Sequence, residues 1–207
     1  KKINRNSVVI INTANNAKTN VGPWSLGVPD VYKLNGVYIG TNSTNFVLSS
    51  NKVNDFVLNN GQKDTMYDLA SISLSPSSTL SVANEAFMLV QFDNFTANAT
   101  QGEGFFCIES YPVDDSLTAN GLTTIKTWEI PQYSTTLANT PVTYDLRDVI
   151  DFRPYKANTA NITTQFTTAT INPALAANTF DSNTTNYNPF PSSTLITNFS
   201  YYLGRKD

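Results

Sequence analysis

Short apolar runs separated by turn residues dominate the chain, and they predict β-strands. Residues 7–11 form the first apolar run, and in residues 70–75 apolar side chains alternate with serines, which is the period of a half-buried strand. Residues 86–90 and 105–108 are continuously apolar, as expected for strands in the middle of a core. Such short, closely spaced strands are typical of a sandwich or barrel-like module.

Turn residues place two connections between these strands. Asn35-Gly36 lies between apolar runs at residues 30–34 and 37–39, and this dipeptide between apolar runs is the strongest short signal for a hairpin. Residues 58–62 repeat the same turn chemistry. We therefore predict a hairpin at Asn35-Gly36 and a second turn near Gly61.

One segment, residues 145–154, predicts a helix. Leu146, Val149 and Ile150 fall on one side of a helical turn, and Pro154 would end it. We expect one or two helical turns that are anchored by this apolar side.

The same segment carries the main candidate site. Asp145, Asp148 and Asp151 come three apart, so a Ca²⁺ site with carboxylate ligands is one interpretation. Arg147 and Arg153 are interleaved with them, and ion pairing at helical spacing explains the same residues. We favour the second interpretation, a structural ion-pair cluster.

Composition argues against most catalytic chemistry. The chain has no His and one Cys, so it cannot build a His-based triad or a Cys/His zinc site alone. That cysteine, Cys107, lies in an apolar run and is predicted to be a small buried hydrophobe. We expect no enzyme activity, no catalytic residues, no cofactor and no metal.

Charge and hydropathy limit the partners. The 13 basic and 16 acidic residues give a net charge of -3, which does not favour broad binding to nucleic acid. No apolar run approaches the roughly 20 residues of a membrane span, so membrane insertion is not expected.

The composition changes towards the end of the chain. Between residues 156 and 198 only Lys156 and Asp181 are charged, and Thr, Asn, Ala and Pro fill most of the stretch. Its scattered phenylalanines need a dry environment, so we predict an ordered extended arm that lies across a neighbour.

These observations divide the chain into four parts. An N-terminal extended segment (1–29) precedes a β-sandwich domain (30–112), a connector with the short helix (113–155) and the arm, which leads into a further β region (156–207). Lys1 is not an initiator Met, and residues 199–207 read as a strand entering a turn with no partner after it. We therefore expect the chain to be part of a longer protein.

Several segments, taken in order, resemble one family of virion proteins. They are residues 30–38 (DVYKLNGVY), 56–68 (FVLNNGQKDTMYD), 90–95 (VQFDNF), 109–112 (ESYP), 144–154 (YDLRDVIDFRP) and 201–207 (YYLGRKD). They are similar to large structural proteins of tailed bacteriophages, especially contractile-tailed phages of cyanobacteria and other marine bacteria. The chain departs from the family pattern in residues 156–198 and at Lys206, where a nonpolar residue is expected.

The resemblance implies a structural component of a phage tail fibre or baseplate, located in the virion and assembled in the host cytoplasm. Its partners would be other virion proteins and further copies of itself, and no catalytic residue is carried over. The expected fold is all-β, an antiparallel sandwich of immunoglobulin or fibronectin type with the helical connector and the Thr/Asn-rich arm.

Two other functions stay open at this point. A receptor-binding module that adsorbs to host surface glycan would use aromatic faces for sugar stacking. The candidate aromatic residues are Trp24, Tyr32, Tyr38, Trp128, Tyr201 and Tyr202. A depolymerase needs two carboxylates at a defined separation, which the sequence does not show.

Overall fold

The computed structural model describes most of the first 158 residues and four short strands after them. The described ranges are 1–13, 22–42, 46–82, 87–98, 104–116 and 124–158, followed by 164–166, 184–187, 193–195 and 203–205. The regular structure of the described ranges consists mainly of strands in mostly antiparallel sheets, and the helices named there are single 3₁₀ turns. The all-β prediction is therefore confirmed.

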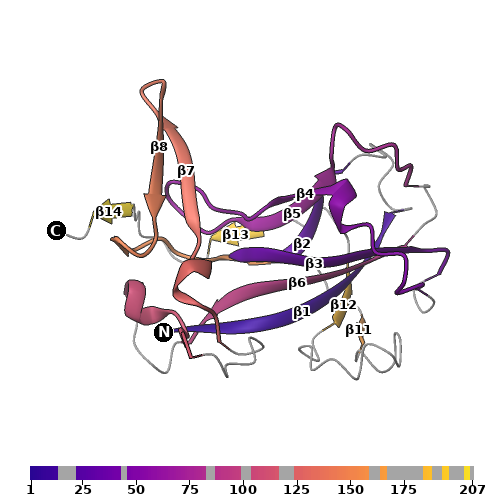
Figure 1. Ribbon diagram of the computed structural model, residues 1–207, viewed down its shortest axis with the longest axis horizontal. Coiled ribbons are helices and arrows are strands. Elements are labelled where there is room, and N and C mark those ends of the chain that lie inside the picture. Colours follow the sequence, from indigo (N-terminus) through magenta and orange to yellow (C-terminus); the bar gives the residue numbers. More distant parts are fainter. Residues whose placement is uncertain are drawn as a thin grey trace.

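The largest sheet has the strand order β11-β12-β1-β6-β3. β1 (Lys2–Asn12) pairs antiparallel with β6 (Phe87–Ala97) along its whole length, and β3 (Val31–Gly40) pairs with the other edge of β6. β6 is buried from Met88 to Phe95, which explains why its sequence is apolar without alternation at its start. Figure 1 shows these three strands running side by side through the middle of the molecule.

A second sheet contributes to the same core. β2 (Trp24–Pro29), β5 (Leu69–Leu74) and β4 (Phe56–Asn59) are ordered β2-β5-β4. Trp24, Ala70 and Ile72 from this sheet share one hydrophobic cluster with Val9 and Val90 of the larger sheet. The predicted alternation in β5 is confirmed, since its apolar residues supply this cluster. The two sheets are thus joined by one dry core.

β1 and β2, which both lie within the first 29 residues, are part of these sheets. β1 pairs with β6 and β2 pairs with β5, so the predicted boundary at residue 30 does not separate an N-terminal segment from the body. The apolar run at residues 7–11 therefore lies within the central strand β1, and its residues 8–11 are buried.

The predicted hairpin at Asn35-Gly36 is absent, and this prediction was wrong. β3 runs straight through both residues, and its register against β6 shifts between Leu34 and Gly36. A Cβ atom on Gly36 would lie 2.7 Å from the Tyr38 ring. The lack of a side chain at this glycine therefore lets the Tyr38 ring pack closely against the bulged part of the strand.

Residues 105–108 also depart from their prediction. Phe106 makes only an isolated bridge to Asp151, and η4 (Ile108–Ser110) follows immediately. Phe105 is 53% exposed, and Cys107 is half-buried, with its Sγ donating to Glu109 Oε2 at 2.8 Å. Residues 105–107 are therefore a loop and not a core strand. Cys107 is only partly buried, so the prediction of a buried hydrophobe was wrong.

The connector contains no helix in residues 145–154. β7 (Gln132–Leu137) and β8 (Thr140–Asp145) form a hairpin, and a turn then leads into β9 (Val149–Asp151). The helical prediction was wrong: Asp145 and Asp151 each accept hydrogen bonds from the arginine two residues later, and β9 pairs with another strand, as described below. Leu146 and Val149 are buried in a separate cluster with Phe95, Tyr111 and Ile130.

The remaining elements are short. η2 (Val53–Asp55) precedes β4, η5 (Thr127–Glu129) precedes β7, and β10 (Lys156–Asn158) pairs with β13 (Ser193–Leu195). β11 (Thr164–Phe166) pairs with β12 (Thr184–Tyr187), which runs parallel to β1, while β14 (Leu203–Arg205) pairs with β9. Most of the predicted arm lies outside the described residues.

Candidate functional site

Charged and phenolic side chains meet in the interior near the start of β1. They come from β1, the β2–β3 connection, the segment after β4, η4 and the chain around β9. We call this set the buried polar cluster, and its members are Lys2, Asp30, Gln62, Tyr67, Tyr111, Asp151, Arg153 and Tyr155.

Lys2 lies at the centre of the cluster. Its Nζ donates to Asp30 Oδ2 at 2.7 Å, to the Tyr67 hydroxyl at 3.0 Å and to the Tyr111 hydroxyl at 3.2 Å. Its side chain has no exposed surface. β1 carries Lys2 inward because the strand is paired along its length with β6. All three donor positions of the ammonium group are therefore occupied inside the protein.

Asp30 accepts three of the hydrogen bonds in the cluster, including the one from Lys2. Its Oδ2 also accepts from the Tyr155 hydroxyl at 2.7 Å, and its Oδ1 accepts from Gln62 Nε2 at 3.0 Å. Asp30 is fully buried and adopts φ of 56°, a left-handed conformation that is uncommon for a residue other than glycine. This backbone conformation connects β2 directly to β3 while the carboxylate stays inside.

Asp151 and Arg153 form the second charged pair. Arg153 donates from Nε to Oδ1 at 2.9 Å and from a terminal nitrogen to Oδ2 at 2.7 Å, a bidentate arrangement. Arg153 also donates to the Lys63 carbonyl at 2.9 Å. The Tyr67 hydroxyl donates to Asp151 Oδ2 and so links this pair to Lys2.

Aromatic rings enclose the two cations. Lys2 Nζ lies 4.4 Å from the ring centre of Tyr67, 4.6 Å from that of Tyr111 and 4.8 Å from that of Phe106. The Arg153 guanidinium lies 4.3 Å from the Tyr67 ring on which Lys2 also rests. Ring faces attract cations, so the enclosure replaces part of the lost hydration.

Burial and charge shift the proton affinities of the cluster. Burial lowers the pKa of Lys2, against the opposing effect of Asp30 and Asp151. Burial alone would raise the pKa of Asp151, but the hydrogen bonds and charge of Arg153 leave that pKa below its ordinary value. Burial, with the nearby carboxylates, raises the pKa of Tyr67, Tyr111 and Tyr155 well above 10.0. The tyrosines are therefore hydrogen-bond donors at neutral pH.

The structure separates the predicted ion-pair residues. Asp151 and Arg153 belong to the buried polar cluster, whereas Asp145 pairs with Arg147 at the base of the hairpin. The backbone N–H of Asp148 donates to the Asp145 carbonyl at 3.0 Å, within the turn that joins the two pairs. Within the described ranges, no three His, Cys, Asp or Glu side chains gather where they could hold a metal ion.

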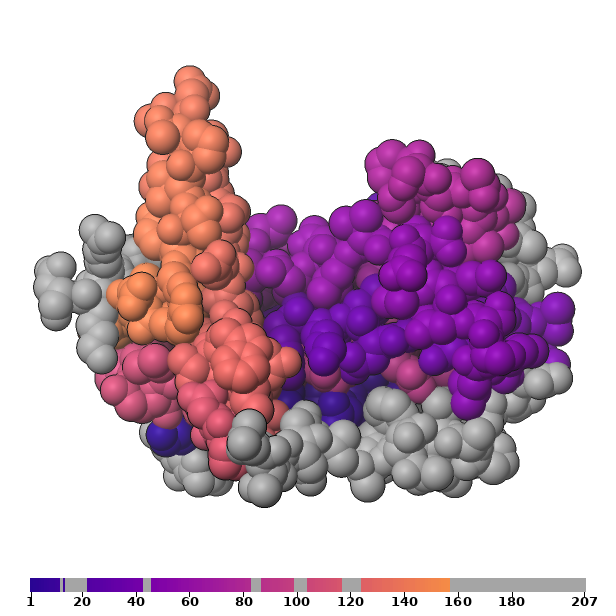
Figure 2. Space-filling view, in the orientation of Figure 1, coloured from indigo at the N-terminus to yellow at the C-terminus, as the bar shows by residue number. Residues whose placement is uncertain are grey.

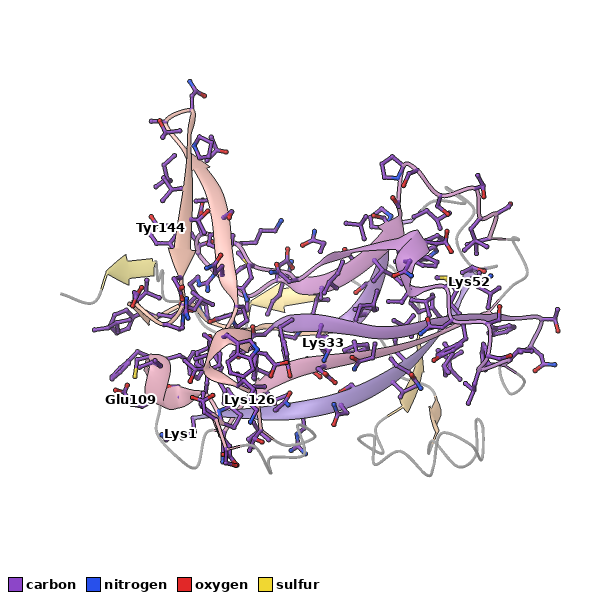
Figure 3. All side chains as sticks on the ribbon, viewed as in Figure 1. Lys1, Lys33, Lys52, Glu109, Lys126 and Tyr144 are labelled. Atoms are coloured by element: carbon purple, nitrogen blue, oxygen red, sulfur yellow. The ribbon has the colours of Figure 1, made fainter. Side chains whose placement is uncertain are left out.

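Sequence reasoning missed most of the cluster. Lys2 and Asp30 lie 28 residues apart, and Tyr67 and Asp151 lie 84 apart, so no local spacing connects them. Figure 3 labels Lys1 and Glu109 at the same end of the molecule, where Lys1 Nζ donates to the Glu109 carbonyl. Two neighbouring lysines therefore hold the start of β1 at this end of the fold. Lys1 binds at the surface, and Lys2 binds in the interior.

Of the aromatic residues considered for sugar stacking, the four that the structure describes do not form one platform. Trp24 and Tyr38 are buried in two different clusters, and Tyr32 stacks on Phe95 at 4.5 Å. Trp128 is 69% exposed. Tyr201 and Tyr202 lie outside the described residues.

The buried polar cluster has balanced formal charge, because it pairs the cations Lys2 and Arg153 with the carboxylates Asp30 and Asp151. No family model, curated protein or solved structure matches the chain in the three comparisons made. In the part of the chain that is described, no helix has the length and apolar character needed to span a bilayer. The geometry of the described residues is therefore the basis for any functional conclusion.

Proposed function

We propose that this chain is a structural component of a bacteriophage tail, in a fibre, baseplate or associated virion protein, and that it acts through assembly contacts. The observation that carries the proposal is the hairpin β7–β8, which projects from the body of the molecule (Figures 1 and 2). Its outer residues are exposed, including Leu137, which is 45% exposed. A projecting hairpin with an exposed leucine near its tip is suited to contact a neighbouring subunit.

Further apolar side chains are exposed on the segments next to this hairpin. Trp128, in η5 before the hairpin, is 69% exposed, and Phe105 and Phe152 are 53% and 40% exposed. The Phe105 and Phe152 rings contact each other, with centres 5.8 Å apart. Aromatic side chains are enriched at protein interfaces, so these positions support assembly through this part of the surface.

Assembly of purified protein tests the proposal. Multi-angle light scattering and cryo-electron microscopy are expected to show oligomers or association with tail particles. Leu137→Ser is expected to weaken that association, while Val57→Ser, which changes another exposed apolar residue on β4, leaves it intact. A permanent monomer that associates with no tail component would contradict the proposal, as would equal effects of the two substitutions.

A second candidate, a module that binds host surface glycan, has support from Trp128. An indole ring that is 69% exposed presents a face on which a sugar can stack. A glycan array distinguishes this function: saturable binding that is lost in Trp128→Ala supports it, and the absence of binding by assembled wild-type protein opposes it.

We also propose that the two joined sheets form a sandwich of immunoglobulin or fibronectin type. The shared core between the β2-β5-β4 sheet and the larger sheet supports this assignment. An experimental structure with complete strand connections would test it.

A further inference from the structure

We propose that Lys2 and Asp30 condense to form an intramolecular isopeptide bond, an amide between Lys2 Nζ and Asp30 Cγ, with release of one water molecule. This modification would be carried out by the chain's own residues, and it goes beyond the proposed structural function without depending on it.

The two reacting groups already touch. Lys2 Nζ and Asp30 Oδ2 are 2.7 Å apart, and the two side chains are 0% and 1% exposed. Groups held in contact react far faster than the same groups in solution, because their translational and rotational freedom has already been lost. The absence of exposed surface also protects the resulting amide from hydrolysis.

Burial favours the neutral, reactive form of the Lys2 amine. A buried ammonium and carboxylate are costly, and transfer of the Nζ proton to Oδ2 along the existing hydrogen bond gives an amine and a carboxylic acid. The pKa of Lys2 is lowered mainly by burial, in agreement with this transfer. The free amine is the nucleophile that an amide bond requires.

The neighbours of Asp30 are placed to assist the attack. The amine forms a bond to Cγ, and the π electrons of the Cγ–Oδ1 bond move onto Oδ1, to which Gln62 Nε2 already donates at 3.0 Å. A second Nζ proton passes to the Oδ2 hydroxyl, the Cγ–Oδ2 bond breaks, water leaves and the Cγ–Oδ1 double bond reforms. Overall, ammonium and carboxylate yield an amide and one water.

Other members of the buried polar cluster act as positioning residues. The Tyr67 oxygen accepts from Lys2 Nζ at 3.0 Å, while its own hydroxyl is held by Asp151. The Tyr155 hydroxyl fixes Oδ2 of Asp30 at 2.7 Å. The left-handed φ of Asp30 is a strained conformation at this site, and such strain is retained only where the surroundings enforce it.

The bond would have a mechanical consequence. β1 and β3 lie on opposite sides of β6, and the amide would tie the first residue of β1 to the residue that precedes β3. The loop that it closes spans 28 residues of sequence separation. Cross-linking of this kind limits the freedom of the unfolded chain.

Mass spectrometry of the folded, purified chain tests the proposal. The denatured protein is expected to weigh one water less than its sequence. Trypsin should yield a branched product that joins the segment ending at Arg5 to residues 19–33, since cleavage follows Lys18 and Lys33. Linear peptides with unmodified Lys2, or water loss confined to a linear peptide, would overturn the proposal.

Two matched variants complete the test. Lys2→Arg keeps a cation but has no amine able to condense in this way, so the full sequence mass is expected. Lys1→Arg changes the neighbouring lysine, which lies at the surface, and should retain the loss of water. Circular dichroism shows whether each variant is folded, and the wild-type peptide map decides the proposal even if Lys2→Arg does not fold. Branched peptides in folded Lys2→Arg would also count against it.

Discussion

At the scale of single residues, two Asp-x-Arg segments show how burial changes the effect of the same local hydrogen bonds on stability. In both, the arginine N–H donates to the aspartate Oδ1 at 3.0 Å and the guanidinium grips the same carboxylate. Asp145 and Arg147 are partly exposed, whereas the Asp151 and Arg153 side chains are 3% and 0% exposed. Only the second pair leaves a buried charge if it is broken.

We therefore expect Asp151→Asn to be strongly destabilising. Removal of one member of a buried pair leaves the other charge uncompensated, at a cost of about 3–5 kcal/mol. Urea unfolding followed by circular dichroism measures this loss. The control is Asp145→Asn, at the exposed pair, which should change the free energy of unfolding far less. Similar losses in both variants would show that burial does not control the effect.

Acid should weaken the fold through the same carboxylates. The pKa of Asp145 is lowered to about 2, chiefly by its hydrogen bond with Arg147, and the pKa of Asp151 is below 3.8 despite its burial. The unfolded chain takes up these protons first, so the stabilisation is complete above the ordinary carboxyl pKa and is lost as pH falls through the folded values.

Urea unfolding from about pH 6 down to about pH 2 measures this pH dependence. The destabilisation by Asp151→Asn should shrink over the lower part of this range, because the wild-type carboxylate is then neutral as well. A difference that does not change with pH would contradict this expectation.

At the scale of elements, the two turn regions show how local signals and tertiary contacts compete. Asn35-Gly36 has hairpin chemistry but lies within β3, while the hairpin β7–β8 turns at Ala138 and Asn139, with φ of 47° and 68°. Both positive φ values match the turn that suits a two-residue hairpin loop. Pairing with β6 keeps β3 continuous at the first site, and the second site lacks the glycine that would have identified it.

Gly61, in the predicted second turn, tests how strongly contacts from the rest of the fold restrict the backbone of a turn. It has φ of 80°, and a Cβ atom there would lie 2.1 Å from the Asp68 carbonyl oxygen. Gly104 also has a positive φ, of 112°, but a Cβ atom there would meet nothing within 4 Å.

Gly61→Ala should therefore destabilise the fold by about 1–3 kcal/mol more than Gly104→Ala, since it must move backbone as well as strain φ. Thermal unfolding of the two variants measures the difference. Equal losses would indicate that backbone strain alone, without the clash, sets the cost.

At the scale of the whole molecule, the buried polar cluster connects regions that otherwise have separate hydrophobic cores. The core between the sheets contains Trp24, while the second core contains Phe95, Tyr111 and Leu146. Lys2 and Asp30 come from the sheet region, and Asp151 comes from β9 beside the second core. The charged network therefore makes unfolding of one region costly for the other.

The chain should consequently unfold in a single transition. Trp128→Phe leaves Trp24 as the only tryptophan, so fluorescence then reports on the core between the sheets alone. Its urea transition is expected to coincide with the loss of strand signal in far-UV circular dichroism. Two separated transitions would show that the regions unfold independently. Because Trp128 is largely exposed, the wild-type protein and Trp128→Phe should have the same urea midpoint when both are followed by circular dichroism.

Much of the strand content could be predicted from the sequence because it depends on neighbouring residues. The apolar run of β1, the alternation of β5 and the continuous apolar start of β6 each reflect which faces of a strand are covered. Absence of histidine and scarcity of charge likewise limited the available chemistry without reference to the fold.

Where the local sequence was compatible with two structures, such as a helix or a strand, the tertiary structure alone decided which one formed. Residues 145–154 have helical spacing, yet β9 pairs with β14 and Asp151 forms a bridge with Phe106, so the segment lies in turns and a strand. The meeting of Lys2, Asp30 and Asp151 depends on strand order and on backbone reversals far apart in the chain. Such contacts leave no periodic trace in the sequence, because each partner is selected by the position of the others in space.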